Sequence, residues 1–107
     1  MLNKDNLIIT KIIHYCDDIA DYIFGMNETD FQADSKTVAA CAFCLGQIGE
    51  LTKKVSEDKK ASLPQIPWHK MYGLRNRIIH DYEGVNLSRL WYIVSIDIPA
   101  LRVNLGG

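Results

Sequence analysis

The sequence predicts an all-α fold, an antiparallel up-and-down bundle of about four main helices. In four stretches, apolar residues recur three and four positions apart, the period of an amphipathic helix, and short connections with polar residues, Gly or Pro separate the stretches. No window sustains the apolar–polar alternation between hairpin turns that is typical of β-strands. With 107 residues, 48% hydrophobic and 23% charged, the chain is expected to form one globular domain over residues 1–107.

The first helix is expected over residues 3–24. Asn3 or Asp5 can cap its N-terminus, and Gly25 can end it. Its apolar positions are Ile8, Ile9, Ile12, Ile13, Cys16, Ile19, Ala20 and Ile23. The polar stretch MNETDFQADS follows, and we expect it to be a connection with room for one short turn.

The second helix is expected over residues 36–57, capped by Asp34 or Ser35. Its broad apolar stripe contains many small residues, which let a neighbouring helix approach closely. The stripe consists of Val38, Ala39, Ala42, Phe43, Leu45, Gln47, Ile48, Leu51, Thr52 and Val55. Pro64 and Pro67 then exclude a continuous helix through the following connection.

Two further helices complete the bundle. Pro67 suits a first helical position, so the third helix is expected over residues 67–79, before a break at Gly84. The last helix is expected to begin near Asn86 and to kink at Pro99. Its heptad-like seam consists of Trp91, Val94, Ile98, Leu101 and Leu105.

The cysteines are predicted to be core residues. Cys16, Cys41 and Cys44 are an odd number, so they cannot form a closed set of disulfides. Cys41 and Cys44 have C-x-x-C spacing, but no second pair of metal ligands follows, and both lie in an apolar stretch. Burial of free thiols is therefore expected, and no metal site is predicted.

Location can also be predicted from composition. No apolar run approaches the roughly 20 residues that a membrane span needs. The N-terminus lacks the pattern of a signal peptide. We therefore expect a cytoplasmic protein without a membrane partner.

Charge is unevenly distributed, although the net charge is only −1. Residues 1–34 carry −5, residues 35–80 carry +5 and residues 81–107 carry −1. Four lysines of the basic part are expected on solvated helix faces: Lys53, Lys54, Lys59 and Lys60. Three other cations, Lys70, Arg75 and Arg77, are expected to contribute to a local positive potential instead. Residues 59–80 contain five cations and no acidic residue, so a local positive potential is predicted there, suited to a nucleic acid.

The stretch RNRIIHDY, residues 75–82, ends this basic part. On a regular helix Arg75 and Tyr82 would lie about 20° apart, but His80 would lie about 140° from Arg75. Convergence therefore requires the helix to end near His80, or a second copy of the chain to supply the missing group. Asn76 lies four residues before His80 and can orient the imidazole. A helix end stabilised by His80 explains the stretch equally well, so the residues alone leave the function open.

The pattern R-x4-H-x-Y, formed by Arg75, His80 and Tyr82, resembles the signature of HepT-type toxins of the HEPN superfamily, small all-α proteins. The resemblance extends over nearly the whole chain. It includes IGEL at residues 48–51, the Pro67–Trp68 pair, Asn76 directly after Arg75, and an aromatic helix after the motif.

The resemblance implies a metal-independent endoribonuclease that needs no cofactor, with two copies of the motif meeting in a cleft of a homodimer. His80 would be the acid–base group, because an imidazole takes up and releases protons near neutral pH. Arg75 would bind the phosphate through paired N–H groups. Asn76 would support them, and Glu50 is expected either to face the cleft and contact Arg75 or to be a surface carboxylate.

The resemblance also implies a partner, a minimal nucleotidyltransferase (MNT) antitoxin that transfers AMP to Tyr82 and so neutralises the toxin. The added phosphate would repel an RNA backbone. An alternative from another functional class is a catalytically silent helical binding module that pairs with such a nucleotidyltransferase. Arg75 and His80 favour the ribonuclease, because a binding module requires neither at this spacing.

Overall fold

The computed structural model describes residues 3–74, 76, 78 and 86–106, and within these ranges the secondary structure is entirely helical. The described elements are α1 (Lys4–Tyr22), α2 (Glu28–Ala33), α3 (Ser35–Thr52), α4 (Glu57–Ser62), α5 (Trp68–Tyr72), α7 (Leu87–Tyr92), the π-helical turn η1 (Ile93–Asp97) and α8 (Ile98–Asn104). The predicted all-α bundle is confirmed.

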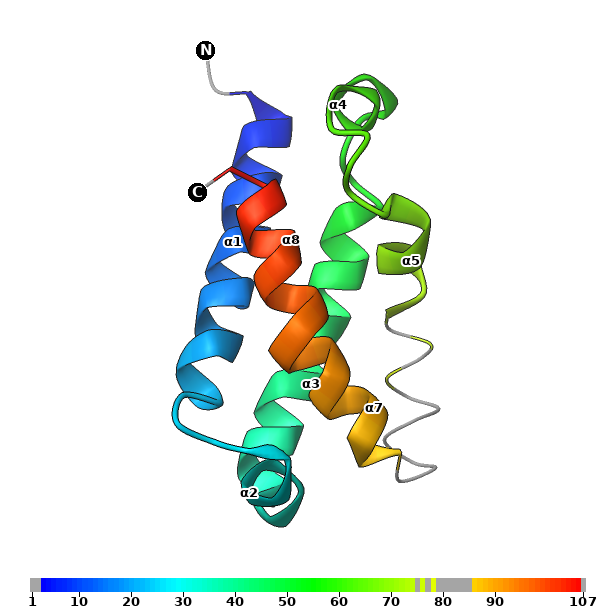
Figure 1. Ribbon diagram of the computed structural model, residues 1–107. Coiled ribbons are helices and arrows are strands. Elements are labelled where there is room, and N and C mark those ends of the chain that lie inside the picture. Colours follow the sequence, from blue (N-terminus) through cyan, green and yellow to red (C-terminus); the bar gives the residue numbers. More distant parts are fainter. Residues whose placement is uncertain (1–2, 75, 77, 79–85, 107) are drawn as a thin grey trace.

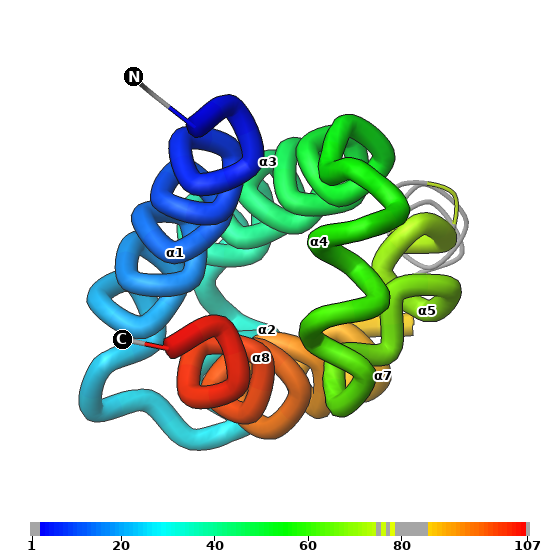
Figure 2. Tube along the Cα trace, turned by 90° about the horizontal axis from the view of Figure 1, so that it is seen from above, coloured from blue at the N-terminus to red at the C-terminus, as the bar shows by residue number. Residues whose placement is uncertain are grey.

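The main helices run in alternating directions. In Figure 1, α1 descends, α3 ascends, α5 starts near the top and descends, and the continuous rod of α7, η1 and α8 ascends in front of α3. Seen from above, α1, α3 and α8 surround the centre of the bundle, and α5 lies on the side away from α1 (Figure 2). The short helices α2 and α4 lie at opposite ends of α3 (Figure 1).

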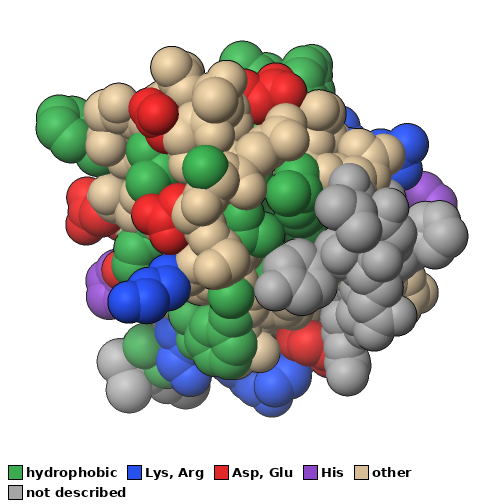
Figure 3. Space-filling model, turned by 90° about the horizontal axis from the view of Figure 1, so that it is seen from below, with side chains coloured by type: hydrophobic (Ala, Val, Ile, Leu, Met, Phe, Trp, Pro, Cys, Tyr) green, Lys and Arg blue, Asp and Glu red, His purple; other side chains and the backbone are tan. Residues whose placement is uncertain are grey.

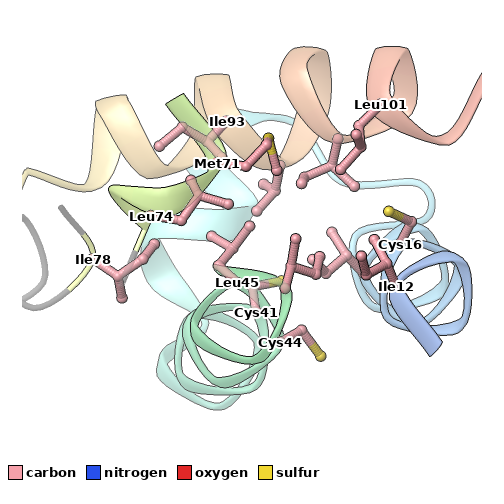
Figure 4. Packing of buried hydrophobic residues seen from close by; sticks show 14 of the residues in the cluster. Ile12, Cys16, Cys41, Cys44, Leu45, Met71, Leu74, Ile78, Ile93 and Leu101 are labelled. Atoms are coloured by element: carbon pink, nitrogen blue, oxygen red, sulfur yellow. The ribbon is translucent and has the colours of Figure 1, made fainter. Parts of the chain in front are cut away.

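One hydrophobic core joins these helices. Ile12 and Ile19 of α1, Leu45 and Ile48 of α3, and Ile93 of η1 are almost completely buried. Figure 4 shows how side chains from α1, α3, α5 and η1 point toward one another. Burial of such aliphatic side chains contributes about 1.5–3 kcal/mol each.

The three cysteines belong to this core, as predicted. Cys16, Cys41 and Cys44 are buried free thiols. Burial raises the pKa of Cys16 and of Cys41 to about 12 and that of Cys44 to about 11, because the thiolate would lose its hydration. They therefore remain protonated near neutral pH.

Side-chain caps begin several helices. The Asn3 side chain accepts from the backbone N–H of Asn6, which confirms the predicted start of the first helix. Asn27 and Asp30 form a reciprocal capping box at the start of α2. The connection therefore contains a six-residue helix, which the buried Phe31 holds against the bundle.

The second main helix differs from the prediction. It ends at Thr52 rather than at residue 57, and α4 forms in the connection where no helix was expected. Ser56 caps α4, and its N–H and hydroxyl both donate to the Asp5 carboxylate, at 2.9 and 2.6 Å. These bonds to α1 stabilise a helix too short to be stable by itself.

The predicted apolar stripe was partly wrong. Ala39 and Phe43 are exposed, because they lie on the face of α3 opposite its buried residues. Phe43 instead makes an edge contact with Tyr15 of α1, with ring centroids 6.3 Å apart. In α1, Ala20 is also exposed.

The last helix begins where predicted, because the Asn86 side chain accepts from the N–H of Arg89 at 3.1 Å. The π-helical turn η1 lies directly before the α8 residues Ile98 and Pro99, next to the place predicted for a kink. A π-helical turn adds one residue to a helix and so changes which side chains face the core. Trp91 was expected on the buried seam but is only partly buried.

Candidate functional site

The predicted motif lies at the edge of the described part of the chain. Arg75, His80 and Tyr82 lie outside the described residues, as does Arg77. Asn76 is described, helical and exposed. The predicted contact between Asn76 and His80 therefore remains a prediction.

Two buried side chains anchor the start of the motif. Leu74 and Ile78 are four residues apart, and both lie in the core (Figure 4). Residues with this spacing share one helix face, so the exposed Asn76 between them lies on the opposite side. The position predicted to support catalysis is therefore accessible to a ligand.

The side chain of Trp68 holds the start of α5 in place. Its indole Nε1 donates to the carbonyl oxygens of Lys60 and Leu63, at 3.1 and 3.2 Å. Pro67 lies at the N-cap position of α5, one residue before the place predicted for it. The Pro–Trp pair thus attaches α5 to the end of α4.

Lys60 was predicted on a solvated helix face, and this was wrong. Only 9% of its side chain is exposed, and Nζ lies 4.6 Å from the centre of the Tyr72 ring. Nζ also lies 3.5 Å from a carboxylate oxygen of Glu57. Lys60 therefore connects α4 to α5. Arg77, in the motif segment, follows the end of α5 by five residues.

Lys70 is held by an ion pair. Its Nζ lies 3.2 Å from Oδ2 of Asp97, which belongs to η1. The positive potential predicted for residues 59–80 is thus weakened at Lys70 by a carboxylate distant in sequence. Neither this pair nor the Lys60–Tyr72 contact has a local sequence signal.

The described chain resumes at Asn86, the cap of α7. Leu90 of α7 and Ile93 of η1 are buried, so the helix after the motif also packs on the core. The described residues on each side of the motif are thus attached to the same bundle.

Glu50 lies on α3 and is partly exposed, 3.5 Å from Nζ of Lys53. The alternative contact, with Arg75, involves a residue outside the described ranges.

Metal ligands do not gather in the described part of the chain. Among those residues, no three His, Cys, Asp or Glu side chains are placed to hold a metal ion. His14 and His69 are both exposed. None of the described helices is long and apolar enough to cross a membrane.

Comparison with known proteins places the chain in a family. The model of the family described as "Ribonuclease HepT-like" matches residues 12–105. "Probable ribonuclease HepT" of Thermococcus cleftensis is 39% identical over 95 residues, covering 82% of this chain and 86% of that protein. "Putative RNase MJ0127" of Methanocaldococcus jannaschii is 38% identical over 100 residues, covering 92% and 83%.

A third relative is less similar. "Putative RNase TTE0752" of Caldanaerobacter subterraneus subsp. tengcongensis is 29% identical over 94 residues, covering 88% of this chain and 84% of that protein. No solved structure matches. From the family match and the all-helical bundle, we conclude that the chain belongs to the HepT-like ribonuclease family of the HEPN superfamily.

Proposed function

We propose that this protein is a ribonuclease toxin that cleaves RNA without a metal ion, with Arg75 and His80 as the catalytic residues. One observation carries the proposal: the family match over residues 12–105 includes the complete R-x4-H-x-Y motif. The names of the relatives support an RNA substrate. The protein would act in the cytoplasm as a single domain of residues 1–107 in each protomer.

The two residue types can perform the reaction. An imidazole of His80 removes the proton from a ribose 2′-OH, and the 2′-oxygen attacks the adjacent phosphorus. The bond to the 5′-oxygen breaks, that oxygen receives a proton from an imidazolium, and a 2′,3′-cyclic phosphate remains. The guanidinium of Arg75 stabilises the negative charge that develops on the phosphate oxygens.

A homodimer supplies the groups that one motif lacks. On a regular helix, His80 lies about 140° from Arg75, so one copy does not direct both groups at the same phosphate. Two copies related by a twofold axis bring two imidazoles and two guanidinium groups to a shared cleft. Asn76 is exposed and can then support the site as a polar ligand.

A nucleotidyltransferase antitoxin would switch this site off by modifying Tyr82. The phenolic oxygen attacks the α-phosphorus of ATP, pyrophosphate leaves, and AMP remains on the tyrosine. The new phosphodiester lies seven residues after Arg75 and competes with RNA for its guanidinium.

Cleavage of a labelled RNA by the purified protein in EDTA tests the proposal. We expect 2′,3′-cyclic phosphate ends, identified by mass spectrometry, and loss of cleavage in His80→Ala and Arg75→Ala with unchanged helix content by circular dichroism. His69→Ala removes an exposed histidine outside the motif and should leave the rate unchanged. A strict requirement for added metal, or full activity of His80→Ala, would contradict the mechanism.

The same assay separates the toxin from the silent binding module. A folded protein that accepts AMP on Tyr82 but never cleaves RNA would support the module. Unfolding of both the Arg75 and His80 variants would show that these residues stabilise a helix end. Light scattering measures the mass, and an active monomer would contradict a shared dimer site.

A further inference from the structure

A small cavity separates α5 from the rod that η1 and α8 form. Its volume is about 90 Å³. Its lining is largely apolar and includes the core residues Met71, Leu74, Ile93, Ile98 and Leu101. Figure 4 shows four of them, Met71, Leu74, Ile93 and Leu101, gathered on one side of the core. Side chains that line a cavity lose van der Waals contacts there, so apolar packing alone holds α5 weakly against the rod.

An ion pair spans this cavity at its rim. Lys70 of α5 and Asp97 of η1 both line the cavity, and Nζ of Lys70 lies 3.2 Å from Oδ2 of Asp97. The two side chains are 44% and 26% exposed, so the pair is partly shielded from water. Its attraction therefore acts between α5 and the rod at a place where the apolar contacts are incomplete.

The π-helical turn gives Asp97 this place. Ile93 and Ile98 are five residues apart and would lie about 140° from each other on a regular helix. Both nevertheless line the cavity, because the extra residue of the π-helical turn brings them toward one face. Asp97 directly precedes Ile98 and so lies beside this face, where it meets Lys70.

The other contacts of α5 lead to different helices. The indole of Trp68 and the ring of Tyr72 both contact Lys60 of α4, and α5 also packs against α3. With five residues and no side-chain cap at its N-terminus, α5 depends on such contacts for its place. The Lys70–Asp97 pair adds the attachment to a third neighbour, η1.

The position of α5 determines where the motif segment begins. Leu74 lies four residues after Lys70 and lines the same cavity, and Arg75 follows directly in the sequence. A displacement of α5 therefore displaces the start of the motif. Catalysis tolerates little displacement, since about 1 Å can cost about 100-fold in rate.

We propose that Lys70 and Asp97 are positioning residues of the proposed ribonuclease site. Their ion pair holds α5 at the distance from η1 that places Arg75 for the reaction on RNA. The inference rests on the proposed function, in which Arg75 is catalytic, and it gives neither Lys70 nor Asp97 a contact with the substrate.

A direct contact of Lys70 with an RNA phosphate is the alternative, because residues 59–80 are basic. In the structure, however, its ammonium is already paired with Asp97. Basic and acidic side chains also lie near one another on the face drawn in Figure 3. The two roles predict different effects of Asp97→Asn. Loss of this carboxylate frees Lys70 for RNA in the alternative, whereas it releases α5 if the pair positions the motif.

A second ion pair provides the matched control. Nε of Arg102 lies 2.8 Å from Oδ1 of Asp17, and these side chains are 33% and 51% exposed. This pair joins α8 to α1, on the side of the rod away from α5 (Figure 2). Asp97→Asn and Asp17→Asn therefore remove the same charge from comparable pairs, and only the first pair holds α5. Urea denaturation should give both variants similar, small losses of stability.

Cleavage kinetics with the labelled RNA distinguish the two roles of the pair. Asp97→Asn and Lys70→Met should each lower kcat about fivefold, the factor expected for loss of a partly exposed ion pair, and leave KM within about twofold of the wild type. Asp17→Asn should leave both constants unchanged. The double variant Lys70→Asp/Asp97→Lys restores the pair with its charges exchanged and should recover at least about half of the wild-type kcat. A lower KM in Asp97→Asn together with a higher KM in Lys70→Met would overturn the inference in favour of direct contact.

Amide hydrogen exchange of the full-length protein without RNA, measured by mass spectrometry, tests the attachment of α5 separately. Peptides from residues 68–74 should exchange at least about threefold faster in Asp97→Asn than in the wild type, and at the wild-type rate in Asp17→Asn. Equal exchange in the two variants would overturn the inference whether or not the protein cleaves RNA. So would unchanged kcat in Asp97→Asn, or an equal loss of kcat in Asp17→Asn. If exchange changes as expected but the wild type cleaves no RNA, the proposed function fails, and the pair holds α5 without the role in catalysis.

Discussion

The ammonium group of Lys60 lies 4.6 Å from the centre of the Tyr72 ring, and this contact joins α4 to α5 directly before the motif segment. Burial lowers the pKa of Lys60, but the Tyr72 side chain and the Glu57 carboxylate outweigh burial. The pKa of Lys60 is therefore raised above its usual value. The charged ammonium is held more tightly in the folded chain than in the unfolded chain.

Lys60→Met keeps most of the apolar contacts and removes the charge. We expect it to lower the free energy of unfolding at pH 7 by about 1 kcal/mol, the size of a partly desolvated cation–π contact. Because the folded pKa is raised, this contribution is fully present below the unfolded pKa of lysine and is lost as pH rises through the folded pKa. Urea unfolding at several pH values should show the two proteins converging at alkaline pH.

In the wild-type background, Tyr72→Leu should lower the free energy of unfolding by a similar amount. In the Lys60→Met background it should add little further loss, since both changes remove the same contact. Greater stability of Lys60→Met at pH 7 would mean that the cost of burying the ammonium exceeds its attraction to the ring. That result would contradict the stabilising role given to this contact.

The thiols provide a second prediction. Cys16, Cys41 and Cys44 are buried, and their pKa values are raised to about 12, 12 and 11. The native protein should therefore resist a disulfide reagent such as DTNB at pH 8, and all three thiols should react in urea. As pH rises, Cys44 should react before the other two, because its pKa is raised least.

The same thiols affect stability at high pH. Their stabilising contribution is full below about pH 9, the ordinary pKa of the thiol, and is lost as pH rises toward the raised folded values. Fast reaction of the native protein at pH 8, at the rate of a free thiol, would contradict their place in the core. In Cys16→Ser, the rate of reaction with DTNB measures the exposure of Cys41 and Cys44 alone.

Local patterns predicted the elements that local interactions form. The start of α1 at Asn3 and of α7 at Asn86 followed from cap residues placed before apolar periodic stretches. The second helix was predicted to extend too far. The apolar Val55 continued the helical period of α3, although Val55 belongs to the turn that follows this helix. The helix α4 was missed because bonds from Ser56 to the distant Asp5 help to hold its start.

Contacts between residues distant in sequence limited how much of the site could be predicted. The Lys70–Asp97 pair joins residues far apart in sequence, and a single sequence gives no measure of such proximity. The side chain of Phe43 has the same apolar character whether it faces the core or solvent, so its exposure was not predictable from its type. The buried Leu74 was not identified from the sequence, and the roles of Arg75, His80 and Tyr82 rest on the motif.

Truncation of Phe31 tests how α2 is held. Phe31 is completely buried, and its ring centroid lies 5.4 Å from that of the partly buried Trp91. Phe31→Ala should lower the free energy of unfolding by about 3–5 kcal/mol, measured by urea denaturation. Trp91→Ala should cost less, because its side chain keeps part of its solvent contact in the fold. A larger loss for Trp91→Ala would contradict this order.

The cap of α7 offers a test that connects stability to the proposed site. Asn86→Ala removes the acceptor for the N–H of Arg89 and should lower the free energy of unfolding by about 1 kcal/mol, whereas Asn86→Ser should restore it. Asn3→Ala is the matched control, since it removes the cap of α1, far in sequence from the motif, at a similar cost.

Both Ala variants should therefore lose similar stability, but only Asn86→Ala should reduce RNA cleavage, because Asn86 follows Tyr82 by four residues and its cap fixes the start of α7 there. Cleavage is measured at a temperature where all variants remain folded, so a lower rate reports on the position of the motif rather than on the folded fraction. Equal loss of cleavage in Asn3→Ala and Asn86→Ala would assign the effect to overall stability. Unchanged cleavage in both would mean that the motif is held by Leu74 and Ile78 on its other side.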